Sequence, residues 1–146
     1  MLSATSEYAL RALSQLARVS PGRALLGRRL AQRAGIPPQY LSKIMLSLRN
    51  AGLVAAVRGT GGGYTLLRPA KAIHLIDVVR LFEGPVGWPH CLLRPSRPCS
   101  GSQSCTAHAH WAKVGRGYLD FLENTTLSDI SGPAARQARL AARNHS

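Results

Sequence analysis

The chain has 146 residues, of which 45% are hydrophobic, and this is enough for one domain with a packed core. Nineteen Lys and Arg residues outnumber six Asp and Glu residues, so the formal net charge is +13. This imbalance indicates a polyanionic partner, either nucleic acid or an acidic membrane surface. No apolar run approaches the roughly 18–20 residues of a membrane span. Glu7 and Arg11 stand where an export signal needs its apolar stretch, so we expect a cytoplasmic protein with no membrane partner.

The positive charge is concentrated in the N-terminal half. Residues 1–69 hold ten Lys and Arg residues against one acid, Glu7, for a net charge of +9. Residues 70–146 hold nine against five acids, for a net charge of +4. We therefore expect the polyanion-binding site within residues 1–69.

The spacing of apolar residues predicts three helices in this half. The first runs from Ser3 to about Val19, and Pro21 and Gly22 follow it. The second is short, is closed by Gly35, and turns four apolar residues inward: Leu26, Leu30, Ala31 and Ala34. The third runs from about Pro38 to Asn50 and buries Leu41, Ile44, Met45 and Leu48.

A hairpin is predicted directly after these helices. Two strand-like runs, residues 53–57 and 64–67, flank the glycine-rich residues 58–63. Two short helices joined by a glycine-containing turn, followed by such a hairpin, predict a winged helix-turn-helix. A phosphate-binding loop is a poor alternative, because no Lys-Ser or Lys-Thr follows the glycines. A purely structural helical hairpin remains the other alternative.

The polar face of the third helix and the hairpin tip supply the candidate DNA contacts. Gln39, Tyr40, Ser42 and Lys43 are placed to meet base edges or phosphates. Arg28 and Arg58 are expected to contact the DNA backbone or the minor groove. The full candidate set is Arg28, Gln39, Tyr40, Ser42, Lys43, Arg49, Arg58, Gly59 and Thr60.

Three cysteines follow a further predicted helix, which runs from Ile73 to about Glu83. Cys91, Cys99 and Cys105 are spaced C-x7-C-x5-C, and His108 completes a C-x-x-H pattern. Three is an odd number, and a reducing cytoplasm disfavours disulfides, so metal binding or redox chemistry is the better interpretation. Thiolates favour zinc, copper(I) or an iron–sulfur cluster. Three unrelated free cysteines are the alternative.

A long helix is predicted from about Thr106 to Asn124. Its apolar seam consists of Trp111, Val114, Tyr118, Phe121 and Leu122. We expect this seam to pack against a second copy of the chain, since a twofold dimer is the commonest arrangement. The alternative is that it packs on its own N-terminal domain. Thr126 is the expected cap of a last turn, Leu127–Ile130.

Four segments resemble the Rrf2 family of bacterial winged-helix regulators. They are residues 6–11 (Ser-Glu-Tyr-Ala-Leu-Arg), 40–44 (Tyr-Leu-Ser-Lys-Ile), 51–54 (Ala-Gly-Leu-Val) and 58–64 (Arg-Gly-Thr-Gly-Gly-Gly-Tyr). The resemblance covers about residues 1–130. It implies a homodimer that binds a palindromic operator. It also implies sensing of redox state, nitric oxide or iron–sulfur status through a cluster held by the three cysteines.

The resemblance carries specific residues with it. Cys91, Cys99 and Cys105 would hold a 2Fe–2S or 4Fe–4S cluster, with His108 or Glu7 of the partner subunit as the fourth ligand. Seven residues separate the first two cysteines, where five are usual in the family. Some members of the family discriminate bases with an acidic residue, and neither Ser42 nor Lys43 is acidic. The operator of those members is therefore not transferred to this chain.

Together these features predict a mainly α protein. It consists of a winged helix-turn-helix domain (1–69), a connecting helix and turn (70–87), a cluster-binding loop (88–108), a dimerisation helix (109–131) and a basic, disordered tail (132–146). The predicted function is a DNA-binding repressor gated by an iron–sulfur cluster, with no small-molecule substrate. No paired carboxylates or Ser/His/Asp set indicate an enzyme. The alternatives are a DNA-binding protein with structural zinc and no redox sensing, and an iron–sulfur carrier or redox protein.

Overall fold

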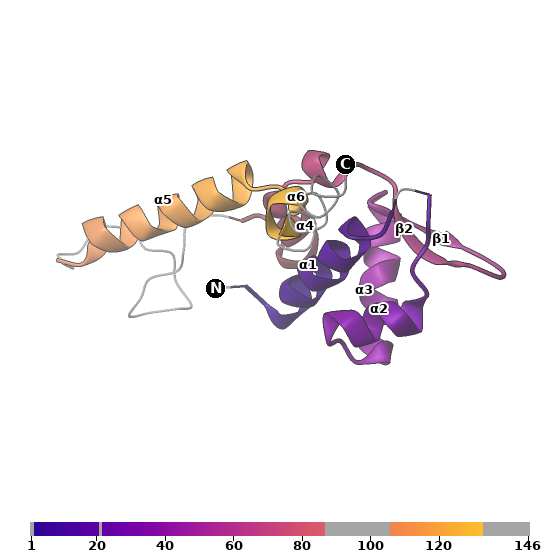
Figure 1. The fold of residues 1–146 in the computed structure, drawn as a ribbon. Helices are drawn as coiled ribbons and strands as arrows, with labels where there is room; N and C mark the ends of the chain where they lie inside the picture. Colours follow the sequence, from indigo (N-terminus) through magenta and orange to yellow (C-terminus); the bar gives the residue numbers. More distant parts are fainter. Residues whose placement is uncertain (1, 21, 87–105, 133–146) are drawn as a thin grey trace, which may run out of the picture.

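The computed structural model describes residues 2–20, 22–86 and 106–132. These residues form a mainly helical body with one antiparallel hairpin, and a long helix projects from it (Figure 1). The elements in chain order are α1 (Ala4–Ala17), α2 (Gly27–Ala34), α3 (Pro38–Asn50), β1 (Val54–Val57), β2 (Gly63–Leu66), the 3-10 turn η1 (Ala70–Ala72), α4 (Leu75–Glu83), α5 (His108–Asn124) and α6 (Leu127–Ile130). Within the described part, no helix is long and apolar enough to span a membrane.

Helix α1 lies at the centre of this body. It begins after Ser3, whose hydroxyl accepts a hydrogen bond from the Ser6 amide. Ala9, Ala12 and Leu13 are completely buried, and α1 contacts α2, α3, α4 and α6. Because alanine side chains are small, helices on both sides of α1 can approach it closely.

Helices α2 and α3 form the predicted helix-turn-helix. Gly35 ends α2 in the left-handed conformation (φ 66°), which glycine adopts without steric cost. Pro38 then occupies the first turn of α3, where its missing N–H removes no helical hydrogen bond. Leu41, Ile44, Met45 and Leu48 are buried, as the apolar spacing of the third helix predicted.

The prediction that Leu26 points inward is wrong. Its side chain is 47% exposed, and the preceding Leu25 is buried instead. The reason is that α2 begins one residue later, at Gly27, and Leu25 is part of an extended segment. The backbone N–H and C=O of Leu25 both pair with Tyr64 at 2.9 Å. This segment therefore lies beside β2 and pairs with it at one residue, as a short antiparallel strand would.

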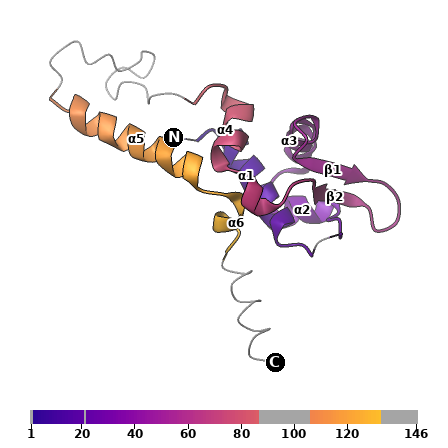
Figure 2. The same cartoon turned by 90° about the horizontal axis from the view of Figure 1, so that it is seen from above.

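The hairpin pairs Val54 with Leu66 and Val57 with Gly63. Residues 58–62 form its tip, which we call the wing tip. Val54 is buried against the helical body and the exposed residues of β1 follow it, so one end of the hairpin is anchored and the other projects (Figures 1 and 2).

The extended chain just before α4 pairs with the extended chain between α5 and α6, and this pairing joins the two parts of the C-terminal half. Leu75 donates its backbone N–H to the Thr125 carbonyl at 2.9 Å, and Leu127 donates to the Ile73 carbonyl at 2.8 Å. Leu122 and Leu127 are buried in the same core as α1. Thr126 caps α6 as expected, in a reciprocal box with Asp129.

A carboxylate joins the end of α4 to the start of α1. Glu83 accepts a hydrogen bond from the Ser3 amide. Partial burial acts to raise the pKa of Glu83, but hydrogen bonds from the Ser3 amide and the Ser3 and Ser6 hydroxyls outweigh it, and the pKa lies below the ordinary 4.5. The charge also stands at the N-terminal, positive end of the α1 dipole.

We predict that Glu83→Gln lowers the free energy of unfolding at pH 7 by roughly 0.3–1 kcal/mol, the range for a charge at a helix terminus. Because folding lowers this pKa, the contribution is present above about pH 4.5 and is lost as the pH falls further. Urea unfolding of both proteins at pH 7 and pH 3 measures this, and the difference should shrink at pH 3. Glu123→Gln is the control, since that carboxylate makes only an exposed ion pair. An equal loss in both variants would contradict the prediction.

Candidate nucleic-acid interface

The outward face of α3 presents the side chains that sequence analysis assigned to it. Gln39, Ser42, Lys43 and Arg49 are exposed, and Tyr40 is 52% exposed. The Ser42 hydroxyl donates to the Pro38 carbonyl at 3.3 Å, which leaves its lone pairs available to a ligand. All five predicted contacts on this helix are therefore exposed.

Tyr40 occupies a different position from its neighbours, at the edge of this face. Its ring lies 6.3 Å from the ring of Tyr8 on α1, at a tilt of 45°. The Arg11 guanidinium lies 5.7 Å from the centre of the Tyr8 ring, within cation–π range. Tyr40 thus connects the start of α3 to α1 while keeping half of its surface exposed.

One exposed residue of this face is absent from the predicted contacts. Leu46 is 55% exposed and lies on the side of α3 opposite its buried residues. It follows Lys43 by three residues and Gln39 by seven, so all three share one side of α3. That spacing was the available signal, but Leu46 was assigned to neither the buried side nor the polar side of the helix.

The wing tip carries Arg58, Gly59 and Thr60, all exposed as predicted. Two glycines behind them are required by close contacts. A Cβ at Gly62 would collide with the Val57 carbonyl oxygen, and one at Gly63 would collide with the Leu25 carbonyl. Gly63 also has φ +141°, which L side chains rarely adopt. These glycines let the hairpin close tightly and so fix where Arg58 projects.

An open groove separates the wing from the start of α2. Its walls include Leu26, Gly27, Arg28, Val57 and Gly59. Arg28 and Arg58 thus stand on the two elements that border this groove. We use the name basic face for the exposed cations of α2, α3 and the wing tip: Arg28, Arg29, Arg33, Lys43, Arg49 and Arg58.

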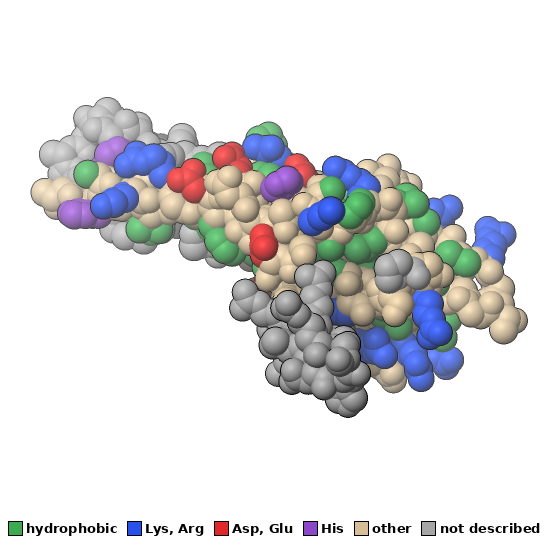
Figure 3. Space-filling view, turned by 45° about the horizontal axis from the view of Figure 1, so that its top comes forward, with side chains coloured by type: hydrophobic (Ala, Val, Ile, Leu, Met, Phe, Trp, Pro, Cys, Tyr) green, Lys and Arg blue, Asp and Glu red, His purple; other side chains and the backbone are tan. Residues whose placement is uncertain are grey.

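The basic face has no acidic neighbours in the sequence, since Glu7 is the only acid among residues 1–69. Figure 3 shows Lys and Arg side chains at the end of the molecule that carries α2 and the hairpin, while the visible acids lie over the middle. The field at this end is therefore strongly positive.

The three predicted cysteine ligands lie outside the described residues. Glu7 is exposed in the first turn of α1, and His108 is the half-buried first residue of α5. Among residues 2–20, 22–86 and 106–132, no three His, Cys, Asp or Glu residues cluster as a metal site. The beginning of α5 lies at the far tip of the molecule, away from α1, in both views (Figures 1 and 2).

The predicted seam of α5 divides into two parts. Leu122 is 1% exposed in the core of its own chain, so the expectation that it faces a second copy is wrong. Tyr118 and Leu119 pack partly against this core. Burial and the nearby Glu83 charge both raise the pKa of Tyr118. Val114 and Phe121 remain 51% and 53% exposed.

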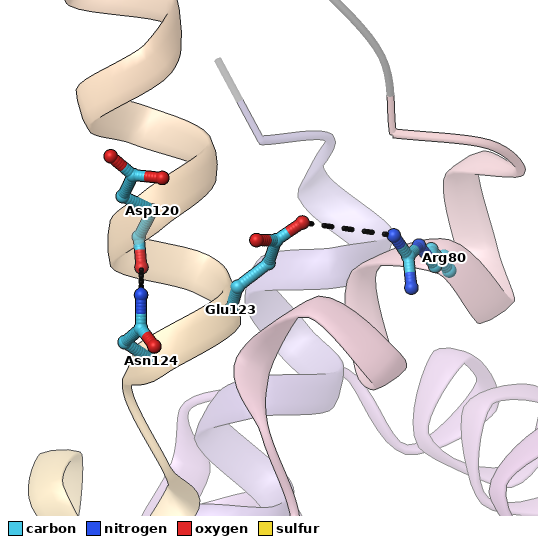
Figure 4. Close-up of polar contacts among 4 residues, drawn as sticks. All are labelled: Arg80, Asp120, Glu123 and Asn124. Carbon is cyan, nitrogen blue, oxygen red and sulfur yellow. Dashed lines mark hydrogen bonds and ion pairs between the residues drawn. The ribbon is translucent and has the colours of Figure 1, made fainter.

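An exposed ion pair also links α4 to α5. The Arg80 guanidinium lies 4.0 Å from the Glu123 carboxylate, and the Asn124 amide donates to the Asp120 carbonyl at 2.8 Å (Figure 4). Both ion-pair side chains are about half exposed, so the pair adds little to stability. The end of α5 is held mainly by the burial of Leu122.

The fold and the basic face define a winged-helix DNA-binding protein. The profile of the Rrf2 family, described as an iron-dependent transcriptional regulator, matches residues 2–133. The chain belongs to this family.

Relatives and solved structures agree with this assignment. An rrf2-like HTH-type transcriptional regulator of Rhodobacter capsulatus is 36% identical over 93% of this chain and 97% of its own length. The HTH-type regulator IscR of Vibrio cholerae is 33% identical over 88% of this chain and 73% of its own. These relatives are transcriptional regulators and not enzymes, as expected.

Two solved structures share the fold. CymR, the global cysteine regulator of B. subtilis, has a TM-score of 0.74 at 27% identity and covers 90% of this chain and 95% of its own. T. potens IscR has a TM-score of 0.66 at 28% identity, with 89% of this chain and 85% of its own covered. Both confirm the predicted mainly helical winged-helix fold.

We predict that Gly63→Ala disrupts the hairpin more than Gly61→Ala does. Gly61 has φ +76° and open space around it, so alanine there costs only the left-handed conformation, about 1–2 kcal/mol. At Gly63 the backbone of Leu25 must also move. Thermal unfolding at equal protein concentration measures both, and Gly63→Ala should have the lower midpoint. Equal midpoints would show that the close approach is not a constraint.

Proposed function

We propose that this chain is a cytoplasmic repressor that binds a palindromic operator as a homodimer. The observation that carries the proposal is the basic face, whose cations come from α2, α3 and the wing tip, with no acidic residue between them in the sequence. In this arrangement α3 enters the major groove, and Gln39, Tyr40, Ser42 and Lys43 meet base edges or phosphates. Arg49 and the residues of the wing tip, Arg58, Gly59 and Thr60, contact the backbone or the minor groove, and Arg28 does so from α2.

The exposed part of α5 is the proposed dimer contact. Val114 and Phe121 are seven residues apart, on one side of the helix, and both are more than half exposed. Gly117 lies between them, and a Cβ there would meet nothing within 4 Å in the single chain. Two such helices can therefore approach closely around a twofold axis, which would place two copies of α3 on successive half-sites.

The proposed sensor is an iron–sulfur cluster held by Cys91, Cys99 and Cys105. Three thiolates with an imidazole or a carboxylate are a donor set that fits iron in such a cluster, and the description of the family as iron-dependent supports this. Bound there, a cluster supplies iron that changes oxidation state and reacts with oxygen or nitric oxide. His108 and Glu7 of the partner subunit are the candidate fourth ligands.

The position of α5 favours the partner subunit as the source of Glu7, if Glu7 is the fourth ligand. Within one chain, the beginning of α5 and the first turn of α1 lie apart (Figures 1 and 2). A site that uses Glu7 together with residues next to His108 is therefore more readily made by two chains. His108 needs no second chain, because it follows Cys105 by three residues.

Helix α1 offers a physical connection from this site to the DNA-binding face. Glu7 directly precedes Tyr8, whose ring lies against Tyr40 of α3. A constraint on Glu7 acts on the helix that positions the start of α3. The proposed switch is that residues 91–108 of one chain, held in place or released, alter the spacing of the two α3 helices.

A structural zinc site is the second candidate, because zinc takes the same Cys3His donors. In this case the protein binds DNA but does not respond to iron chemistry.

We predict that Arg58→Ala weakens binding to duplex DNA and reduces the salt dependence of the binding constant. Each phosphate contact contributes about one unit to the slope of log K against log [salt]. Fluorescence anisotropy over 50–200 mM salt measures this, and a loss of about one unit per bound chain is expected. Lys113→Ala, on α5, removes the same charge outside the basic face. If both variants lose slope equally, the wing tip does not contact DNA.

We predict that Phe121→Asp converts the dimer to a monomer, because it places a charge in an apolar contact. Analytical ultracentrifugation of the variant should give the mass of one chain, and the unchanged protein the mass of two. Leu67→Asp is the matched control, since Leu67 is 57% exposed in the N-terminal half. A dimer that survives Phe121→Asp would place the contact elsewhere.

We predict that protein purified without oxygen is brown and contains iron and sulfide in equal amounts. Cys99→Ser should lose both, since a serine hydroxyl is a poor ligand for cluster iron, whereas Ser104→Ala should keep both. Absorption spectra with iron, sulfide and zinc analysis measure this. A colourless protein with about one zinc per chain would favour the second candidate.

A further inference from the structure

An exposed leucine stands in the middle of the DNA-facing side of α3. The side opposite the buried residues is formed by Gln39, Lys43, Leu46 and Asn50, at steps of four, three and four residues. The other three side chains are polar or charged, whereas Leu46 has no hydrogen-bonding group and is 55% exposed. The helix therefore places one apolar contact at the centre of a polar surface.

The surroundings of Leu46 determine what can cover it. Lys43 lies one turn before it and Arg49 follows it by three residues, and both are exposed. A second copy of this surface would bring like charges together, and an apolar protein partner would have to bury these cations unpaired. A polyanion with an apolar group inside its groove meets both requirements at once.

The DNA major groove contains one such group, the C5-methyl of thymine. The other groups that bases present there are hydrogen-bond donors and acceptors. A leucine side chain gains from burying the methyl but gains nothing from the other three bases. An exposed apolar residue on a recognition helix is thus suited to reading thymine.

We propose that Leu46 is a specificity-determining residue that selects thymine at one position of each half-site through its C5-methyl group. This inference rests on the proposed placement of α3 in the major groove. It predicts a preference for thymine that the polar contacts do not explain. It assigns to Leu46 a contribution to sequence preference rather than to the attraction for phosphates.

The test removes the methyl group from the DNA and the leucine from the protein. The full-length protein first selects a duplex from a randomised pool. Each thymine of that duplex is then replaced in turn by deoxyuridine, which differs only by the missing methyl. We expect the affinity to fall about fourfold at one thymine per half-site, as for the loss of one buried methyl group.

The variant Leu46→Ala completes the cycle. It should bind the thymine duplex more weakly, by a similar factor or more, and should be insensitive to deoxyuridine at that position. Leu67→Ala, equally exposed but outside α3, should keep the full sensitivity. Because Leu46 contributes little to the core, the variant should unfold at the temperature of the unchanged protein.

The outcomes separate this inference from the proposed function. If no duplex is enriched from the pool, both the operator-binding function and the inference are wrong. If a duplex is enriched but deoxyuridine has no effect at any position, only the inference is wrong. The same holds if Leu46→Ala retains the full response to deoxyuridine.

Discussion

The rest of the structure depends on the burial of α1 between two sets of helices. Ala9 and Ala12 are completely buried, and their small size lets α2 and α3 pack on one side and α4 and α6 on the other. The position of the basic face and the position of α5 are therefore both defined relative to a single helix.

Two side-chain contacts in the N-terminal half of α1 join it to α4 and α3. At its start, the Ser3 amide and hydroxyl are bound by Glu83 from α4, so the helix is attached to the C-terminal half. Five residues later, Tyr8 contacts Tyr40 of α3. These contacts link α1 to α4 on one hand and to α3 on the other within one chain.

Much of the fold follows from the sequence because local signals and burial agree there. The apolar spacing of α3, the left-handed Gly35 and the glycine-rich hairpin each predicted what is observed. Leu26 was misassigned because the chain is extended at Leu25, and the pairing of Leu25 with Tyr64 is a long-range contact that periodicity does not report. Leu122 was assigned to a dimer for the same reason, since helical spacing shows that a face is apolar but not what covers it. Leu46 was assigned to neither side of α3, although its spacing places it with Gln39 and Lys43.

In the proposed function, the state of the cysteine-bearing segment controls the affinity for DNA. The most direct measurement is the affinity of the anaerobically purified protein for its selected palindromic duplex, before and after the bound iron is removed with a chelator. The proposed switch requires a change of about tenfold or more, while the mass of the protein in solution stays that of a dimer. Equal affinities in the two states would rule out the switch and leave a DNA-binding dimer that does not sense through this segment.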